Sequence, residues 1–190
     1  MTEFRDHFST LAESYSAHRP TYPPELFEVV SAAAPRRDGA WDCATGNGQA
    51  ALGLAACFER VIATDGSAEQ IGEATPHERV EYRVAVAESS GLDDASVDIV
   101  TVAQALHWFD HDAFYREVER VMRPDGVFVA WAYALATVST EVDAVVGELY
   151  SGILDGCWPA RRRYIDEAYA TVPFPFDEIA TPELEMSVMW

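Results

Sequence analysis

A glycine-bearing turn between Trp41 and Ala51 carries the clearest chemical signal in the sequence. It places Gly46 and Gly48 between an apolar run and an alanine-rich segment typical of a helix. Glycines let the backbone approach a ligand closely, and the start of the following helix presents unpaired N–H groups to that ligand. The pattern Gly46-x-Gly48-x-x-Ala51, with Asp65 where an acid would hold a ribose, also fits the dinucleotide fingerprint. The sequence therefore predicts a nucleotide-cofactor loop.

Acidic residues near this loop help to distinguish between possible cofactors. Asp42 immediately precedes the loop, and Ala87-Glu88 follow a third apolar run. A carboxylate at Asp42 would repel a pyrophosphate, whereas it attracts the ammonium of an amino-acid moiety, directly or through water. With Asp65 on a ribose and Glu88 beside an adenine amine, the pattern favours a cofactor that combines amino acid, ribose and adenine. An NAD-dependent oxidoreductase is the weaker alternative, because little chain remains for its substrate domain.

A histidine beside two aromatic residues follows the fourth predicted strand. His107 and Trp108 thereby fall at the carboxyl edge of the sheet, where ligands of open α/β folds bind. His107 either takes part in the chemistry or is a packed, hydrogen-bonded core histidine. His111 and its acidic neighbours belong to a strand-to-helix loop rather than to the helical i, i+4 frame of a zinc pair, so we expect no metal site.

Alternating short apolar runs and longer amphipathic runs predict the elements that position these residues. Strands joined by helices in this order form a parallel sheet. We expect strands over residues 39–43, 60–64, 80–86, 97–102 and 127–131, and helices over 48–57, 67–74 and 111–121. Ser67 is the predicted N-cap of the second helix, and the turn Arg123–Gly126 ends the third. The predicted fold class is α/β.

Further elements are predicted on both sides of this core. Helices over residues 3–16 and 24–33 precede it; helices over 141–154 and 159–170 and a final strand over 184–190 follow it. We expect one domain over residues 1–190, made of a helical lid (1–36), a cofactor-binding core (37–133) and a helical insert with the final strand (134–190).

The charge balance argues against several classes of partner. The net charge is −19, and all 13 basic residues are arginine. Because nucleic-acid affinity comes largely from basic residues that neutralise phosphates, we expect no nucleic-acid partner, and we expect Arg161–Arg163 to form a solvated helix face. No apolar run is long enough to cross a bilayer and residues 1–19 lack a secretory signal, so the expected location is cytoplasmic, without membrane. A lysine-free acidic surface also makes a halophilic origin a hypothesis.

Motifs in a fixed order along residues 38–131 resemble those of the class I S-adenosylmethionine-dependent methyltransferases. Asp42-x-Ala44-x-Gly46-x-Gly48 is similar to that family's acid-x-Gly-x-Gly-x-Gly loop, and residues 63–67 are similar to its second-strand acid motif. The following motifs are matched by Ala87-Glu88, by residues 92–100 and by the helix and turn over 114–126. Residues 15–23 and 104–109 further resemble the trans-aconitate methyltransferase-like branch, which acts on small molecules.

Two positions depart from the family's pattern. Ala44 replaces the usual first glycine, and Gln70 stands where the family often has methionine against the adenine. Alanine is small, so we expect the turn to form.

The resemblance implies S-adenosylmethionine as cofactor and S-adenosylhomocysteine as product. It implies methyl transfer to an oxygen, nitrogen or carbon of a small molecule, with a carboxylate among the candidates; the alternative is a protein that binds the cofactor without turnover. The implied cofactor-binding residues are Asp42, Ala44, Thr45, Gly46, Gly48, Asp65, Gly66, Ser67, Gln70, Ala87, Glu88 and Gln104.

The resemblance also implies a substrate side. Tyr15, Arg19 and Tyr22 either cover the cofactor as a lid or dock an N-terminal helix on the core, and Trp108 adjoins the substrate. A carboxylate acceptor needs no general base, whereas for a hydroxyl or phenol the first candidate base is His107.

The Rossmann-like fold of the family closes with a helix and a seventh, antiparallel strand. This chain reaches Trp190 without room for either, so we expect the last strands to be missing. Either the sequence is a fragment of a longer protein, which we favour, or an uncovered sheet edge is covered by another chain, as in a dimer.

Overall fold

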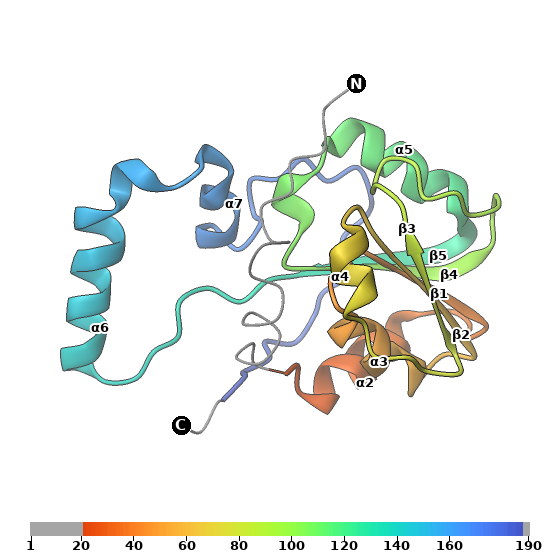
Figure 1. Ribbon diagram of the computed structural model, residues 1–190, viewed down its shortest axis with the longest axis horizontal. Helices are drawn as coiled ribbons and strands as arrows, with labels where there is room; N and C mark the ends of the chain where they lie inside the picture. Colours follow the sequence, from red (N-terminus) through yellow and green to blue (C-terminus); the bar gives the residue numbers. More distant parts are fainter. Residues whose placement is uncertain (1–20, 188–190) are drawn as a thin grey trace.

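Five parallel strands form the centre of the computed structural model, which describes residues 21–187 (Figure 1). The strands are β1 (Gly39–Cys43), β2 (Arg60–Asp65), β3 (Val80–Val84), β4 (Val97–Ala103) and β5 (Met122–Trp131), in the sheet order β3-β2-β1-β4-β5. The order reverses between β1 and β4, and in open α/β sheets the ligand crevice lies above the carboxyl ends of the strands at that point. The predicted parallel α/β sheet is confirmed.

Helices cover both faces of this sheet (Figure 1). One face carries α2 (Pro24–Ala33) and α3 (Gln49–Ala55), the other carries α5 (His111–Val121), and α4 (Ala68–Gly72) follows β2. The helices α2 and α5 have their predicted bounds. The helices α3 and α4 are shorter than predicted; α3 begins after Gly48, whose left-handed φ of 90° makes it the N-cap. Ser67 caps α4 as predicted, because its hydroxyl accepts the N–H of Gln70.

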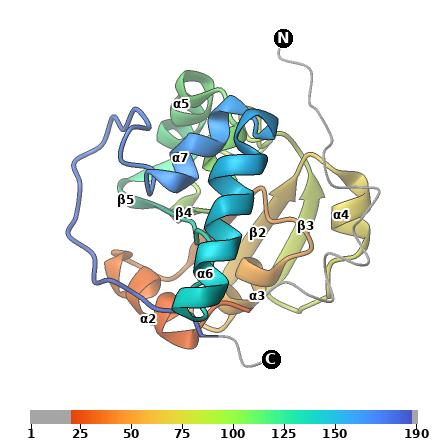
Figure 2. The same ribbon diagram turned by 90° about the vertical axis from the view of Figure 1, so that its left-hand side faces the viewer.

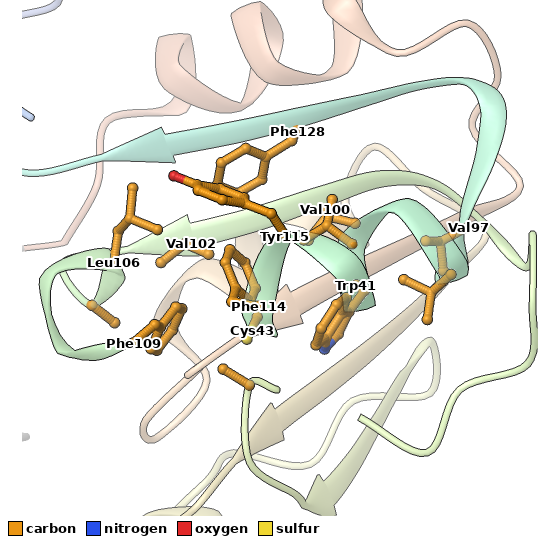
Figure 3. Close-up of a cluster of buried hydrophobic side chains, with 14 of the residues drawn as sticks. Trp41, Cys43, Val97, Val100, Val102, Leu106, Phe109, Phe114, Tyr115 and Phe128 are labelled. Carbon is orange, nitrogen blue, oxygen red and sulfur yellow. The ribbon is translucent and has the colours of Figure 1, made fainter. Parts of the chain in front are cut away.

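The core between the sheet and α5 is aromatic (Figure 3). Trp41 of β1 is fully buried, and its ring centre lies 6.2 Å from that of Phe114 on α5, which lies 5.6 Å from that of Phe128 on β5. Successive strand side chains point to opposite faces of a sheet. Trp41 and Cys43 therefore enter this core, whereas Asp42 between them faces α3.

The start of β5 differs from the prediction. The turn expected over Arg123–Gly126 is a bulged beginning of β5, because Val97 pairs with Met122 while Ile99 pairs with Val127. The buried Asp98 carboxylate explains the difference: it accepts the Arg123 guanidinium at 2.5 Å as well as the Gly39 amide at 3.0 Å. These bonds hold the extra residues against β4. Within the described residues, β5 pairs on one side only, with β4.

The chain after β5 forms an arm on the side toward which the strands' carboxyl ends point (Figures 1 and 2). α6 (Thr140–Gly147) continues as a π-helical segment (Glu148–Ile153), followed by two 3-10 turns (Asp155–Cys157 and Ala160–Arg162) and α7 (Arg163–Asp166). No side chain of α6 is buried. The arm is thus joined to the sheet mainly through its two ends.

Two predictions for the C-terminal part are wrong. The helix expected over 159–170 ends at Asp166, because Ala168 and Tyr169 have left-handed φ values of 49° and 62°. The strand expected over 184–190 does not form in residues 184–187, which pair with no strand among the described residues; residues 188–190 lie outside that range. The helix predicted over 3–16 also lies outside it. None of the helices formed by residues 21–187 has the length and apolar character that crossing a bilayer requires.

Candidate active site

Two residues with left-handed backbones mark the carboxyl ends of β1 and β4. Ala44 has a φ of 55° and Gln104 has a φ of 59°, although neither is glycine. Such conformations cost about 1–2 kcal/mol for residues with a side chain, and they cluster at binding sites whose surroundings hold them. Since β1 and β4 flank the reversal of the strand order, both residues lie at the crevice of the fold. The turn at Ala44 forms as predicted.

The loop after β1 depends on glycine at two positions. Gly46 and Gly48 have φ values of 59° and 90°. A Cβ atom on Gly48 would lie 2.4 Å from the Tyr82 hydroxyl, so a side chain there would have to displace the Tyr82 ring as well as strain the backbone. A Cβ atom on Gly46 would lie 3.6 Å from Oε1 of Gln70. The bare backbone of Gly46 therefore faces the Gln70 amide.

Asp42 lies beneath this loop and is fully buried. Thr45 Oγ1 donates to one of its carboxylate oxygens at 2.5 Å, and Thr101 Oγ1 donates to the other at 2.9 Å. Burial raises the pKa of Asp42 to about 6, although both hydroxyl bonds act in the opposite direction. Because Asp42 is fully buried and already accepts two hydroxyl bonds, we expect it to act on a ligand through the loop that it holds and through its charge. Thr101 was missed in the sequence, although it stands opposite Asp42 in the β1–β4 register.

Asp65 ends β2 and ties the loop to α4. Its Oδ2 accepts the N–H of Gly46 and its Oδ1 accepts the N–H of Ser67, both at 2.8 Å. Asp65 and the neighbouring Gly66 are only half-buried. The predicted ribose-binding acid thus stands at the rim of the loop, and two backbone donors stabilise its charge.

Gln70 on α4 is 8% exposed, yet its buried side-chain Nε2 has no hydrogen-bond partner among the described residues. Its backbone N–H is bonded to Ser67 Oγ. A buried amide without partners costs free energy. A ligand between α4 and Gly46 would remove this cost.

The segment after β3 reaches across to α5. Ala87 is buried, and Glu88 accepts the N–H of Asp110, the N-cap of α5, at 3.0 Å. Glu88 is thereby fixed at the edge of the crevice. Its contact with an adenine amine stays a prediction.

His107 belongs to a 3-10 turn (Leu106–Trp108) just after β4. It is 3% exposed, its ring centre lies 4.6 Å from that of Trp108, and its Nδ1 lies 3.3 Å from the Tyr169 hydroxyl. Burial, together with the positive charges of Arg162 and Arg161, lowers the pKa of His107 to about 4. His107 is therefore neutral near pH 7. Its Nε2 atom has no hydrogen-bond partner within residues 21–187.

The bonds around Tyr169 assign the proton on this histidine. Burial raises the pKa of Tyr169, so the hydroxyl keeps its proton, and a backbone bond from Leu106 already reaches the hydroxyl oxygen. With the O–H donating to Nδ1 of His107, the ring proton lies on Nε2; this is the tautomer on which the proposal below is built. Tyr169 was missed because it follows His107 by 62 residues and no local pattern connects the two.

The arginine cluster contributes more than a solvated face. Arg161 donates to the carbonyl oxygens of Trp108 and Phe109 at 2.7 and 3.0 Å, which anchors the 3-10 turn. This role was missed, since a run of arginines at the surface is usually only solvated.

Tyr22 packs at the carboxyl end of β5. Its ring centre is 5.7 Å from that of Trp131 and 6.5 Å from that of Tyr133, whose carbonyl accepts Gln104 Nε2 at 3.4 Å. Its hydroxyl is also close enough to Tyr169 to affect that residue's pKa. The other predicted lid residues, Tyr15 and Arg19, lie outside the described residues.

His111, whose spacing from His107 superficially suggests a metal pair, is bonded to the protein backbone. His111 Nε2 lies 3.0 Å from the Leu106 carbonyl oxygen. In the part of the chain that the structure describes, no three histidine, cysteine or acidic side chains meet as metal ligands would.

Comparison with known proteins gives consistent matches. A family model described as "Methyltransferase domain" matches residues 41–130. A Dictyostelium discoideum protein named as a methyltransferase is 40% identical over 93% of this chain and 68% of its own length. A solved Anaeromyxobacter dehalogenans protein named as a type II methyltransferase is 51% identical with a TM-score of 0.80, over 86% of this chain and 70% of its own.

The name of a relative from Saccharomyces cerevisiae includes the cofactor as well as the reaction. It carries the name S-adenosylmethionine-dependent methyltransferase and is 29% identical over 63% of this chain, but only 44% of its own length. The residues matched by the family model, 41–130, include the loop, the end of β2 and the turn after β4.

Proposed function

Because this chain belongs to the class I S-adenosylmethionine-dependent methyltransferases, we propose that it methylates a carboxylate oxygen of a small-molecule acid. The observation that supports this choice is the neutral His107 in the turn after β4, whose Nδ1 is occupied by the Tyr169 hydroxyl, so that Nε2 is the nitrogen left for an acceptor. S-adenosylmethionine is the cofactor, and the residues around the loop fit it.

The cofactor side offers a place for each part of that molecule. Asp65 at the rim would accept ribose hydroxyls, and the unpaired Gln70 amide and the bare backbone of Gly46 leave room for an adenosine group beside them. The buried charge of Asp42 would draw the amino-acid ammonium toward the loop without touching it. When bound, S-adenosylmethionine supplies an electrophilic methyl group.

The acceptor side carries a locally positive potential in a protein of net charge −19. Arg161 and Arg162 lie close enough to His107 to depress its pKa, so the same field attracts an anion. One carboxylate oxygen would accept the Nε2–H of His107, and the other would be left free to attack. Holding a nucleophile about 3 to 3.5 Å from the methyl carbon, in line, supplies much of the barrier reduction.

A hydroxyl or phenol acceptor is disfavoured by the same geometry. It must lose a proton, and a histidine with a pKa of about 4 is a poor general base near pH 7. A carboxylate is ionised at neutral pH and needs no base.

The test is methyl transfer from methyl-labelled S-adenosylmethionine to matched panels of small carboxylic acids, phenols and amines. We expect labelled esters from one or more acids and no product from the phenols or amines. Methylation of phenols or amines alone would contradict the carboxylate proposal. Binding of S-adenosylhomocysteine with no transfer to any panel would favour the cofactor-binding alternative.

A further inference from the structure

A cavity of about 210 Å³ lies at the amino ends of the strands, at the opposite end of the sheet from the crevice. It is bordered by the first residues of β1, β2 and β4 and by the segment that leads into β4. Three of the 13 arginines line it: Arg60, Arg83 and Arg123. Arginines gathered around one cavity attract an anion, even in a protein of net charge −19.

Each of these arginines keeps N–H groups that bond to none of the described residues. Arg60 donates only through Nη2, and Arg83 only through Nε and Nη2, in both cases to Glu81. Arg123 donates only through Nη1, to Asp98 and Asp38. Guanidinium groups with spare donors are the usual partners of carboxylate and phosphate oxygens.

Carboxylates hold the three guanidinium groups in place. Glu81 pairs with Arg60 at 2.6 Å and with Arg83 at 2.7 Å. Asp98, whose side chain is fully buried, pairs with Arg123. Side chains that are held in advance lose little freedom when a ligand binds, so the spare donors are available at a low entropic cost.

Two exposed carboxylates, Asp38 and Asp93, also line the cavity and oppose an anion. Asp38 is already paired with Arg123 at 3.2 Å, whereas Asp93 has no ion pair among the described residues. The lining thus carries three positive charges against two negative ones. This small excess predicts a modest affinity, and it makes Asp93 the residue whose neutralisation should strengthen binding.

The floor of the cavity is apolar. Ile62, Leu92 and Val97 line it, are at most 7% exposed and belong to one core cluster. An apolar group that rests on these side chains leaves water, which favours binding. The volume is below the roughly 300 Å³ at which pockets for drug-sized ligands begin, so the ligand must be small.

We propose that this cavity binds a small phosphate monoester, with its phosphate at the three arginines and its apolar part on Ile62 and Leu92. A phosphate monoester carries three acceptor oxygens, one more than a carboxylate, and it is a dianion at about pH 8. Each arginine can therefore donate to an oxygen of its own. The site does not rest on the proposed function, because the crevice lies at the other end of the sheet.

The test is calorimetric titration with phenyl phosphate at about pH 8. Saturating S-adenosylhomocysteine is present, so that the cofactor loop is not the site measured. Arg60→Gln and Arg83→Gln should each bind about tenfold more weakly, because each loses a charge-assisted donor. Asp93→Asn should bind about threefold more tightly, because it removes an opposing charge. The matched control is Arg37→Gln, which removes an exposed arginine near the same end of the sheet that does not line the cavity.

Two further ligands, inorganic phosphate and benzoate, identify the part of the ligand that is recognised. Both should bind about tenfold more weakly than phenyl phosphate, because the first lacks the apolar part and the second lacks one oxygen and one charge. Absence of phenyl phosphate binding, or equal affinity in the wild type and both cavity arginine variants, would overturn the proposal. Equal affinity for benzoate would overturn the phosphate as the recognised group.

Discussion

The proposed cofactor side and the proposed acceptor side of the crevice are held by different kinds of contact. On the cofactor side, Asp42 and Asp65 hold the loop through hydroxyl and backbone N–H donors at 2.5–2.9 Å. On the acceptor side, the rings of His107, Trp108 and Tyr169 pack together, and the adjoining arm leaves Val145 68% and Ile153 71% exposed. The first side is fixed by short polar contacts, whereas the second depends on ring packing and on an arm with little buried surface.

This difference separates two tasks of the molecule. A cofactor common to a whole family is met by a loop that is formed in advance, so little ordering is needed on binding. The proposed acceptor would be met by residues held by the C-terminal part, such as Tyr169 and Arg161. Changes on one side should therefore leave the function of the other intact.

The largest effect is expected from Asp65→Ala. The substitution removes the acceptor of the Gly46 and Ser67 N–H bonds together with the proposed ribose contact. Loss of charge-assisted bonds worth about 3 kcal/mol lowers the affinity for S-adenosylhomocysteine about 100-fold or more. Calorimetric titration measures this, with Glu73→Ala as a control that should bind normally. Normal binding by Asp65→Ala would contradict the claim that the Asp65 carboxylate holds the loop and the ribose.

Next in size is a pH effect at Asp42. Its pKa in the folded protein, about 6, lies above the ordinary value of 3.8 because the group is buried. The folded state therefore binds more protons than the unfolded state between these values, so this residue's contribution to stability falls as pH rises from 4 to 6. The stability of Asp42→Asn relative to the wild type should rise by about 2.4 kcal/mol between pH 4 and pH 7, most of it below pH 6, and level off above pH 7. Denaturant unfolding at pH 4, 5, 6 and 7 measures the difference; a constant difference would rule out the raised pKa.

A smaller, selective effect is expected from His107→Ala on the acceptor side. Removing the Nε2–H donor should lower kcat/KM for the acid about 30-fold, through loss of a bond to a charged group worth about 2 kcal/mol. The affinity for S-adenosylhomocysteine should stay unchanged. His107→Gln, which keeps a donor in a similar place, should recover most of the rate.

The pH profile separates a donor from a base at the same position. Because the pKa of His107 is about 4, kcat/KM for the acid at saturating cofactor should be flat between pH 5.5 and 8. A rise with an apparent pKa near 6.5 that vanishes in His107→Gln would show a general base instead.

The smallest effect is a gain of stability at Ala44. Its φ of 55° suits glycine, so Ala44→Gly relieves strain that outweighs the added freedom of the unfolded chain. We expect about 1 kcal/mol of added stability in denaturant unfolding. Ala56, with a φ of −71°, gives the matched control, since Ala56→Gly should bring no gain. A loss of stability at Ala44 would indicate that its side chain is needed by the loop.

The sheet was predictable because its signals are local. Apolar runs bounded by turn residues give β1, β2 and β4 within a residue, and Ser67 is a local helix cap. The loop residues follow for the same reason, since Gly46 and Gly48 lie in one short motif. Their roles toward the cofactor stay proposals.

The remaining features depend on contacts between distant residues. The bulged start of β5 needs Asp98 to hold Arg123, and Tyr169 reaches His107 only through the backbone reversal after α7. The burial of both Asp42 oxygens follows from its register with Thr101. Sequence spacing alone specifies none of these contacts.

Hydrogen exchange with and without S-adenosylhomocysteine tests the contrast between the two sides most directly. We predict that the ligand slows exchange in residues 43–49 and 65–70, which carry the loop and α4, and leaves residues 140–153 of the arm unchanged. Protection confined to the arm, or absent from both cofactor segments, would contradict a cofactor site built on the loop of Gly46 and Gly48.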